Sequence, residues 1–156
     1  MTVDIEIRTL ARDDAALMRA MLDLFAVGFD DVAHYASNRP DDTYLARSLS
    51  NPDFIAIVAM HRGEVVGGSA SYVLNKFEQV RAEVYLYDIA VHTDFRRRGI
   101  ATALIRAVQK EGRARGADGL YVQADGDDAP AVALYSTLGR RAQVLHFDID
   151  DPREAG

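Results

Sequence analysis

The chain has 156 residues, a formal net charge of −6 and no cysteine, and 49% of its residues are hydrophobic. This length and balance predict one globular domain spanning residues 1–156 around one core. The missing cysteines exclude disulfides, a thiol nucleophile and a Cys-based zinc site. The acidic charge argues against a nucleic-acid partner. Apolar runs such as 54–60 are too short to cross a bilayer and the N-terminus does not resemble a secretory signal, so we expect no membrane partner and a cytoplasmic location.

The apolar periodicity predicts one strand, two helices, three strands, and then helix, strand, helix and strand along the chain. A loop is expected over 28–42, where glycine, proline and aspartate gather. We expect helices near 13–25, 45–49, 100–112 and 131–138, and strands near 5–7, 54–60, 65–74, 83–91, 120–124 and 143–149. This order predicts an α/β (α+β) fold in which a mixed central sheet of about six to seven strands is flanked by about four helices.

The segment 96–102 has the features of a pyrophosphate site. The sequence RRRGIA at 96–101 follows a strand and opens a helix, and the free N–H groups and dipole of a helix start attract anions. Small residues there let the backbone approach phosphates, and the arginines add positive charge. Three cations at a helix start are unfavourable with respect to the helix dipole unless an anion is bound there. This favours a phosphate site over the alternative, a helix start that is basic by coincidence.

Two motifs resemble those of GNAT acetyltransferases. Arg96-x-x-Gly99-x-Ala101 is similar to their acetyl-CoA pyrophosphate motif, and residues 128–139 are similar to their C-terminal helix motif. Asp128 stands where that family usually has asparagine, and Arg140 stands where it usually has an aromatic residue. The resemblance implies an enzyme that uses acetyl-CoA as acetyl donor. The coenzyme-binding residues that it implies are Ile89, Ala90, Val91, Arg96, Arg97, Arg98, Gly99, Ile100, Ala101, Thr102, Asp128 and Ala131.

The chain is most similar to the GNAT-type aminoglycoside 3-N-acetyltransferases, over residues from about 17 to 150. The segments that carry this likeness are LDLF (22–25), KFEQ (76–79), EVYLYDIAV (83–91), RRRGIATALI (96–105), YVQAD (121–125), PAVALY (130–135) and HFDID (146–150). The resemblance implies acetylation of the 3-amino group of the 2-deoxystreptamine ring by direct attack in a ternary complex, with antibiotic resistance as the result. It also implies a homodimer.

Two residues are expected to act in catalysis. In strict strand alternation Asp88 shares a face with Val84 and Leu86, where a carboxylate is out of place unless it lines a cleft. Such a group can bind an ammonium and accept its proton, although it could instead be a structural acid. Backbone N–H groups near Ala90 and Val91, where GNAT strands bulge and splay, are expected to polarise the carbonyl. Tyr135 matches the tyrosine that protonates the leaving thiolate in that family, with core packing as the alternative.

A polycationic substrate requires several carboxylates. Asp88, Glu83, Asp125 and Asp148 are the acids that we expect to bind it, the last two because they lie in YVQAD and HFDID. The histidines show no metal-ligand spacing, so no metal is expected. Two alternatives remain open. One is a GNAT acetyltransferase of polyamines, another small amine or a protein, and the other is a non-catalytic acetyl-CoA-binding module.

Overall fold

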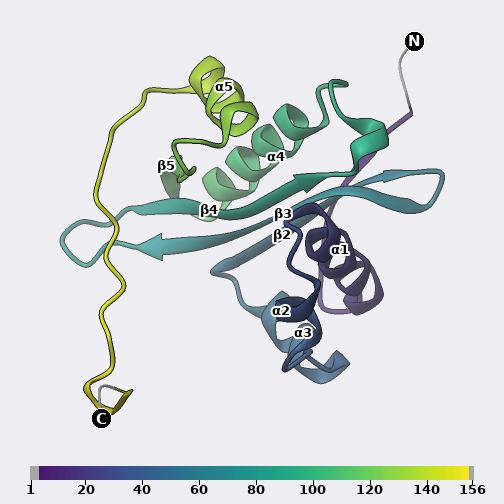
Figure 1. Cartoon of the computed structure of the whole chain (residues 1–156), viewed down its shortest axis with the longest axis horizontal. Helices are drawn as coiled ribbons and strands as arrows, with labels where there is room; N and C mark the ends of the chain where they lie inside the picture. Colours follow the sequence, from purple (N-terminus) through teal and green to yellow (C-terminus); the bar gives the residue numbers. More distant parts are fainter. Residues whose placement is uncertain (1–3, 155–156) are drawn as a thin grey trace. The chain divides into compact units, whose positions relative to one another are not determined.

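The computed structural model describes residues 4–154, which form five strands and five α-helices (Figure 1). The strands are β1 (Glu6–Thr9), β2 (Phe54–His61), β3 (Glu64–Asn75), β4 (Ala82–Val91) and β5 (Ala117–Val122). The helices are α1 (Ala15–Gly28), α2 (Val32–Ala36), α3 (Asp42–Ser50), α4 (Ile100–Ala114) and α5 (Ala129–Leu138). Short 3-10 turns lie at Thr93–Phe95 and Pro152–Glu154.

The strands form one sheet in the order β1-β2-β3-β4-β5. Neighbouring strands are antiparallel except β4 and β5, which are parallel and joined through α4. The hairpin between β2 and β3 turns at Arg62 and Gly63, whose φ angles of 50° and 83° suit a two-residue turn that matches the strand twist. The mixed α/β class is therefore confirmed, with five strands among residues 4–154 rather than six to seven.

Helices cover both faces of this sheet, with α1–α3 on one face and α4 on the other (Figure 1). The buried side chains of α1 recur at helical spacing and share one core cluster with the even-numbered residues of β2, Met21 and Val58 among them. Ile57 and its odd-numbered neighbours face Leu104 of α4 on the other side. The strand β2 is thus buried on both faces, as its unbroken apolar run predicts.

Contacts within the chain divide it into two compact units, one ending at Gln123 and one beginning at Ala124. The sheet and α1–α4 belong to the first unit, and α5 belongs to the second. The prediction of a strand over 143–149 is wrong, because no residue between 140 and 151 is in a strand. Alternating apolar residues make a strand only when a neighbouring strand pairs its backbone, and this segment has no such partner in the described chain.

The loop expected over 28–42 contains the short helix α2. Within residues 4–154, no helix is both long and apolar enough to cross a membrane.

Candidate functional site

The loop before α4 has the backbone of an anion-binding turn. Arg97 and Gly99 have φ angles of 61° and 76°, and Gly99 is the N-cap of α4. Left-handed residues alternating with right-handed ones turn successive N–H groups toward one side. Within residues 4–154 no backbone acceptor takes the N–H groups of residues 97–99, and the first N–H groups of a helix have no partner inside it. The predicted pyrophosphate segment therefore presents a row of free donors.

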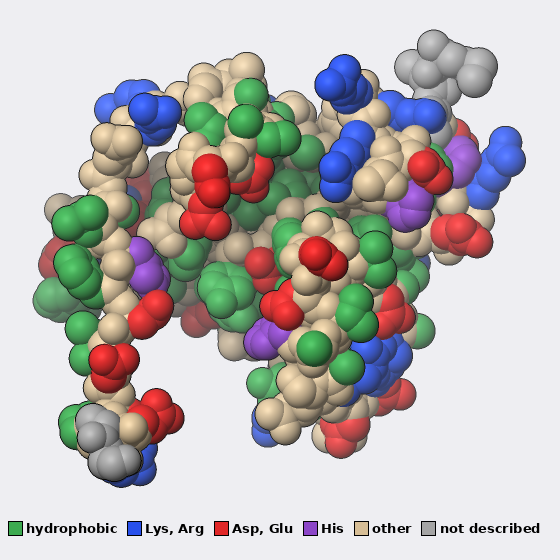
Figure 2. All heavy atoms as spheres, viewed as in Figure 1, with side chains coloured by type: hydrophobic (Ala, Val, Ile, Leu, Met, Phe, Trp, Pro, Cys, Tyr) green, Lys and Arg blue, Asp and Glu red, His purple; other side chains and the backbone are tan. Residues whose placement is uncertain are grey.

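The side chains around this turn leave room and positive charge for an anion. A Cβ atom placed on Gly99 would meet nothing within 4 Å. Arg96 donates to the Val91 carbonyl at 3.4 Å and Arg98 lies over the Phe95 ring. None of the three arginines pairs with a carboxylate of the described chain. Figure 2 shows Lys and Arg side chains gathered near the loop that leads into α4. The geometry fits a phosphate-containing ligand.

The strand β4 separates from β5 after Leu86, which is its last residue paired with β5. From Asp88 to Val91 its ladder partners all lie on β3. Ile89, Ala90 and Val91 pair regularly with Ser69, Gly68 and Gly67. The splay expected near Ala90 and Val91 is therefore present, and it leaves one backbone edge of these residues without a strand partner in the described chain.

The bulge lies elsewhere than expected, at Tyr87 rather than at Ala90 and Val91. Leu86 pairs with Ser71 and Asp88 pairs with Ala70, so Tyr87 is one extra residue on β4. An extra residue interrupts the alternation of side chains and re-aims those that follow it. Strand bulges of this kind are frequent beside active sites.

This bulge overturns the prediction that Asp88 shares a face with Val84. Val84 packs in the cluster beneath α4, whereas Ala70, the partner of Asp88, packs in the cluster beneath α1. Cross-strand partners lie on the same face of a sheet, so Asp88 faces the side of α1–α3. Strict alternation failed because one inserted residue exchanges the two faces.

The Asp88 side chain is half-buried and has no hydrogen bond or ion pair within residues 4–154. Burial raises the pKa of Asp88 above its usual range, and the charge of His34 opposes that rise. A carboxylate that is partly desolvated and unpaired is costly for the fold. Its cost is offset when a cationic ligand binds, which makes Asp88 the strongest candidate for a functional group in the first unit.

Three residues beside Asp88 were not predicted. Tyr35 and His34 belong to α2, in the segment expected to be a loop. Burial, then the charges of Asp88 and Asp31, raise the pKa of Tyr35 to about 12, so its hydroxyl stays protonated. Tyr87 also contributes to that rise. The bulge that turns Tyr87 toward them leaves no mark in the sequence, while α2 is too short to show a period.

In the second unit, Asp128 caps α5. Its Oδ1 accepts from the N–H of Ala131 at 3.3 Å, a role that aspartate and asparagine fill equally well at a helix start. Burial and the Asp128 charge raise the pKa of Tyr135, which therefore remains a protonated phenol.

The other predicted substrate acids have different surroundings. Glu83 lies 2.9 Å from Arg81 and 3.8 Å from Lys76, so the fold already neutralises it. Asp148 lies 3.0 Å from His146 and its side chain is 96% exposed. Asp125 is exposed as well. Only Asp88 of the four acids is both partly buried and unpaired in the described chain.

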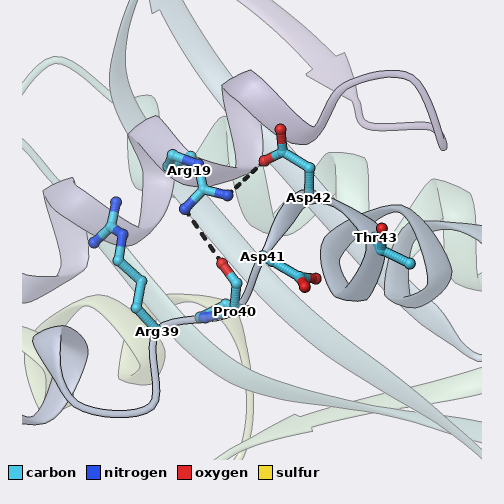
Figure 3. Close-up of a pocket in the computed structure, with 6 residues that line it drawn as sticks. All are labelled: Arg19, Arg39, Pro40, Asp41, Asp42 and Thr43. Atoms are coloured by element: carbon cyan, nitrogen blue, oxygen red, sulfur yellow. Dashed lines mark hydrogen bonds and ion pairs between the residues drawn. The ribbon is translucent and has the colours of Figure 1, made fainter.

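A surface depression between α1 and α3 has a structural role (Figure 3). Arg19 donates to the Pro40 carbonyl at 3.3 Å and to Asp42 at 2.5 Å, and Asp41 accepts from the N–H of Tyr44 at 2.8 Å. These bonds fasten the loop before α3 and cap that helix. In the described part of the chain, no three metal-ligating side chains converge on one point.

A splayed strand pair followed by a helix start with free N–H donors can hold a phosphate-containing ligand beside an open strand edge. The chain matches the Acetyltransferase (GNAT) family over residues 17–139. It therefore belongs to that family of acetyltransferases.

Solved structures include close relatives. An aminoglycoside acetyltransferase from an uncultured soil metagenomic sample is 48% identical, with a TM-score of 0.92 over 96% of this chain and 99% of that one. A second such enzyme, crystallised with sisomicin, is 30% identical, with a TM-score of 0.86 over 94% and 95% of the two chains. An acetyltransferase of Pectobacterium atrosepticum is 32% identical over 94 residues. That match covers 60% of this chain and only 62% of the relative's length.

Proposed function

We propose that this protein is an acetyl-CoA-dependent N-acetyltransferase of aminoglycosides that modifies the 3-amino group of the 2-deoxystreptamine ring and thereby confers antibiotic resistance. The observation that carries the proposal is the half-buried, unpaired Asp88 beside the point where β4 leaves β5. The two metagenomic relatives named as aminoglycoside acetyltransferases support the choice of substrate.

Asp88 prepares the acceptor in this proposal. Its carboxylate binds an ammonium group of the acceptor and takes the proton, directly or through water, so that a neutral amine is formed beside it. The raised pKa of Asp88 makes it a stronger base than an ordinary aspartate. Acetyl-CoA supplies the acetyl group as a thioester, which the amine attacks directly in a ternary complex. The C–N bond forms, the C–S bond breaks, and the second proton of the nitrogen leaves to solvent through water.

The remaining roles belong to backbone donors and to a phenol. The splayed edge of Ile89, Ala90 and Val91 provides N–H groups for the carbonyl oxygen on which negative charge develops. The turn before α4, from Arg96 to Thr102 at the start of the helix, binds the pyrophosphate of the coenzyme. Asp128 and Ala131 complete the coenzyme-binding set.

We assign to Tyr135 the protonation of the departing thiolate, a role that the resemblance to GNAT acetyltransferases implies. The phenol O–H bond breaks as the S–H bond forms, and the phenolate regains its proton from solvent. Tyr135→Phe tests this role: slower acetyl transfer in a stably folded variant supports it, and an unchanged rate leaves packing as its only role.

The proposal includes a homodimer in the cytoplasm. Four apolar side chains of the second unit, Val144, Leu145, Phe147 and Ile149, are 72–89% exposed, and apolar surface of this kind is commonly buried against a partner. Light scattering on the purified protein tests it, because a dimer has twice the 17.2 kDa mass of the chain.

The decisive experiment measures CoA release with gentamicin, kanamycin, spermidine and a short lysine peptide offered in parallel. Rapid turnover with the two drugs and little with the peptide supports the proposal, and NMR of the product then identifies the acetylated amine. Turnover with spermidine or the peptide alone supports a GNAT enzyme for another amine. Coenzyme binding without transfer to any acceptor supports a binding module.

A further inference from the structure

Four tyrosines form a continuous row on the sheet face that carries Asp88. They are Tyr72 on β3, Tyr85 and Tyr87 on β4, and Tyr121 on β5. Tyr72 and Tyr121 are the direct cross-strand partners of Tyr85. We refer to these four side chains as the tyrosine row.

The bulge at Tyr87 completes this row. The Tyr87 ring lies edge-on to Tyr72 and to Tyr85, with centroids 5.6 Å and 5.7 Å away. Tyr85 and Tyr121 stack at 4.7 Å with an angle of 12° between their planes. Mutual contacts of this kind hold rings in fixed orientations. The row is therefore a preformed aromatic surface that needs little ordering when a ligand binds.

The row is more exposed than a sheet face that only supports a core. Tyr87 is 57% exposed, Tyr72 43% and Tyr121 38%. Apolar surface that stays open beside a polar functional group marks a ligand site more often than a packing defect.

The electrostatic potential of the tyrosine row suits a cation. Burial raises the pKa of Tyr72 and Tyr85, with smaller contributions from neighbouring tyrosines and from Asp88, so their hydroxyls stay neutral. The faces of such rings carry negative potential. Within residues 4–154 the arginines that lie over aromatic rings are on Tyr44 and Phe95, outside the row. Its ring faces are therefore not occupied by the protein's own cations.

We propose that the tyrosine row is the surface on which a ring of the cationic acceptor stacks, so that an ammonium group of that ring reaches Asp88. The occupant is an aminosugar or aminocyclitol ring, which has one face of C–H bonds and ammonium groups at its edge. The C–H face packs on the Tyr87 ring, and the ammonium charge is attracted by both the neighbouring rings and the carboxylate. A flexible polyamine carries the positive charge but has no ring, so it cannot stack on the tyrosine row.

This inference rests on the proposed function, and the test separates the two. Initial rates with kanamycin are compared for the wild type, Tyr87→Leu, which removes the ring, and Tyr87→Phe, which keeps it. Spermidine is measured in the same variants, as acceptor or as competitive inhibitor. Phe77→Ala is the matched control, because Phe77 is fully exposed on the loop between β3 and β4, outside the row.

We expect Tyr87→Leu to raise the KM for kanamycin about tenfold, because the aminocyclitol ring loses the aromatic surface on which its C–H face stacks as well as the cation–ring contact. The constant for spermidine, which loses only the cation–ring contact, rises less than that for kanamycin, and the KM for acetyl-CoA changes less than about twofold. Tyr87→Phe keeps the ring and therefore retains most of the wild-type affinity for kanamycin. Phe77→Ala leaves every constant within about twofold of its wild-type value. An unchanged KM for kanamycin in Tyr87→Leu, or an equal loss for spermidine, overturns the role of the row alone. A wild type that acetylates no aminoglycoside overturns the proposed function itself.

Discussion

Asp88 is the residue on which the proposed chemistry depends most directly. Asp88→Asn keeps the size of the side chain and removes its ability to accept a proton. We expect kcat to fall by about 10²–10⁴, the usual contribution of a positioned base. Calorimetric titration with acetyl-CoA should give an unchanged Kd, because the anion-binding turn at Arg97 and Gly99 is a separate feature. Turnover at the wild-type rate would remove Asp88 from the mechanism.

The environment of Asp88 also predicts how the rate depends on pH. The carboxylate acts as a base only when it is ionised, so kcat/KM should rise with pH as Asp88 loses its proton. Because burial raises the pKa of Asp88, the midpoint of this acidic limb should lie above the usual pKa of an aspartate. The charge of His34 lowers that pKa. His34→Gln should therefore move the acidic limb to higher pH in a full pH–rate profile.

His61→Gln is the matched control for this experiment. His61 bonds the Asp4 carbonyl at 3.0 Å and makes no contribution to the pKa of Asp88. Its profile should coincide with that of the wild type. Equal shifts in both variants would mean that the limb reports another group.

At the scale of elements, the start of α4 should control affinity for acetyl-CoA. Gly99 has a φ of 76° and open space where its Cβ would be. Gly99→Val places a branched side chain there and strains the backbone by about 1–3 kcal/mol. We expect the KM for acetyl-CoA to rise about tenfold or more, because the donors before α4 lose their arrangement and their access.

Gly116→Val separates strain from binding. Gly116 follows the other end of α4 with a φ of 87° and equally open space, so it suffers the same backbone strain. Thermal unfolding should show a similar loss of stability in the two variants. An equal rise in the KM for acetyl-CoA would contradict the placement of the phosphates at Gly99.

The elements themselves were largely predictable from sequence, and the exceptions have physical causes. The strand β2 has an unbroken apolar run and the helix α4 has a clear helical period, and the predictions of both elements are confirmed. The segment 143–149 has the alternation of a strand without a paired neighbour in the described chain. The bulge at Tyr87 depends on how two strands align, which a single sequence does not encode locally. This bulge, which the sequence did not predict, places Asp88 on the face of α1–α3 and adds Tyr87 to the tyrosine row.

For the whole molecule, the net charge of −6 should draw a polycationic acceptor toward the protein from a distance. Such attraction extends about 10 Å at an ionic strength of about 0.1 M and weakens as salt is added. We expect the KM for kanamycin to increase several-fold, on the order of threefold to tenfold, between about 0.02 M and 0.3 M salt. The same salt series with spermidine should show a weaker rise, because it carries fewer charges.

Charge reversal at a distance from Asp88 distinguishes this long-range field from local contacts. Glu6 and Glu64 are exposed on β1 and β3, and reversing both to lysine changes the net charge from −6 to −2. We expect this variant to have a higher KM for kanamycin at low salt, a shallower salt dependence and an unchanged kcat. If its KM equals that of the wild type at every salt concentration, the affinity comes from Asp88 and its neighbours alone, and the acidic surface has no part in capturing the substrate.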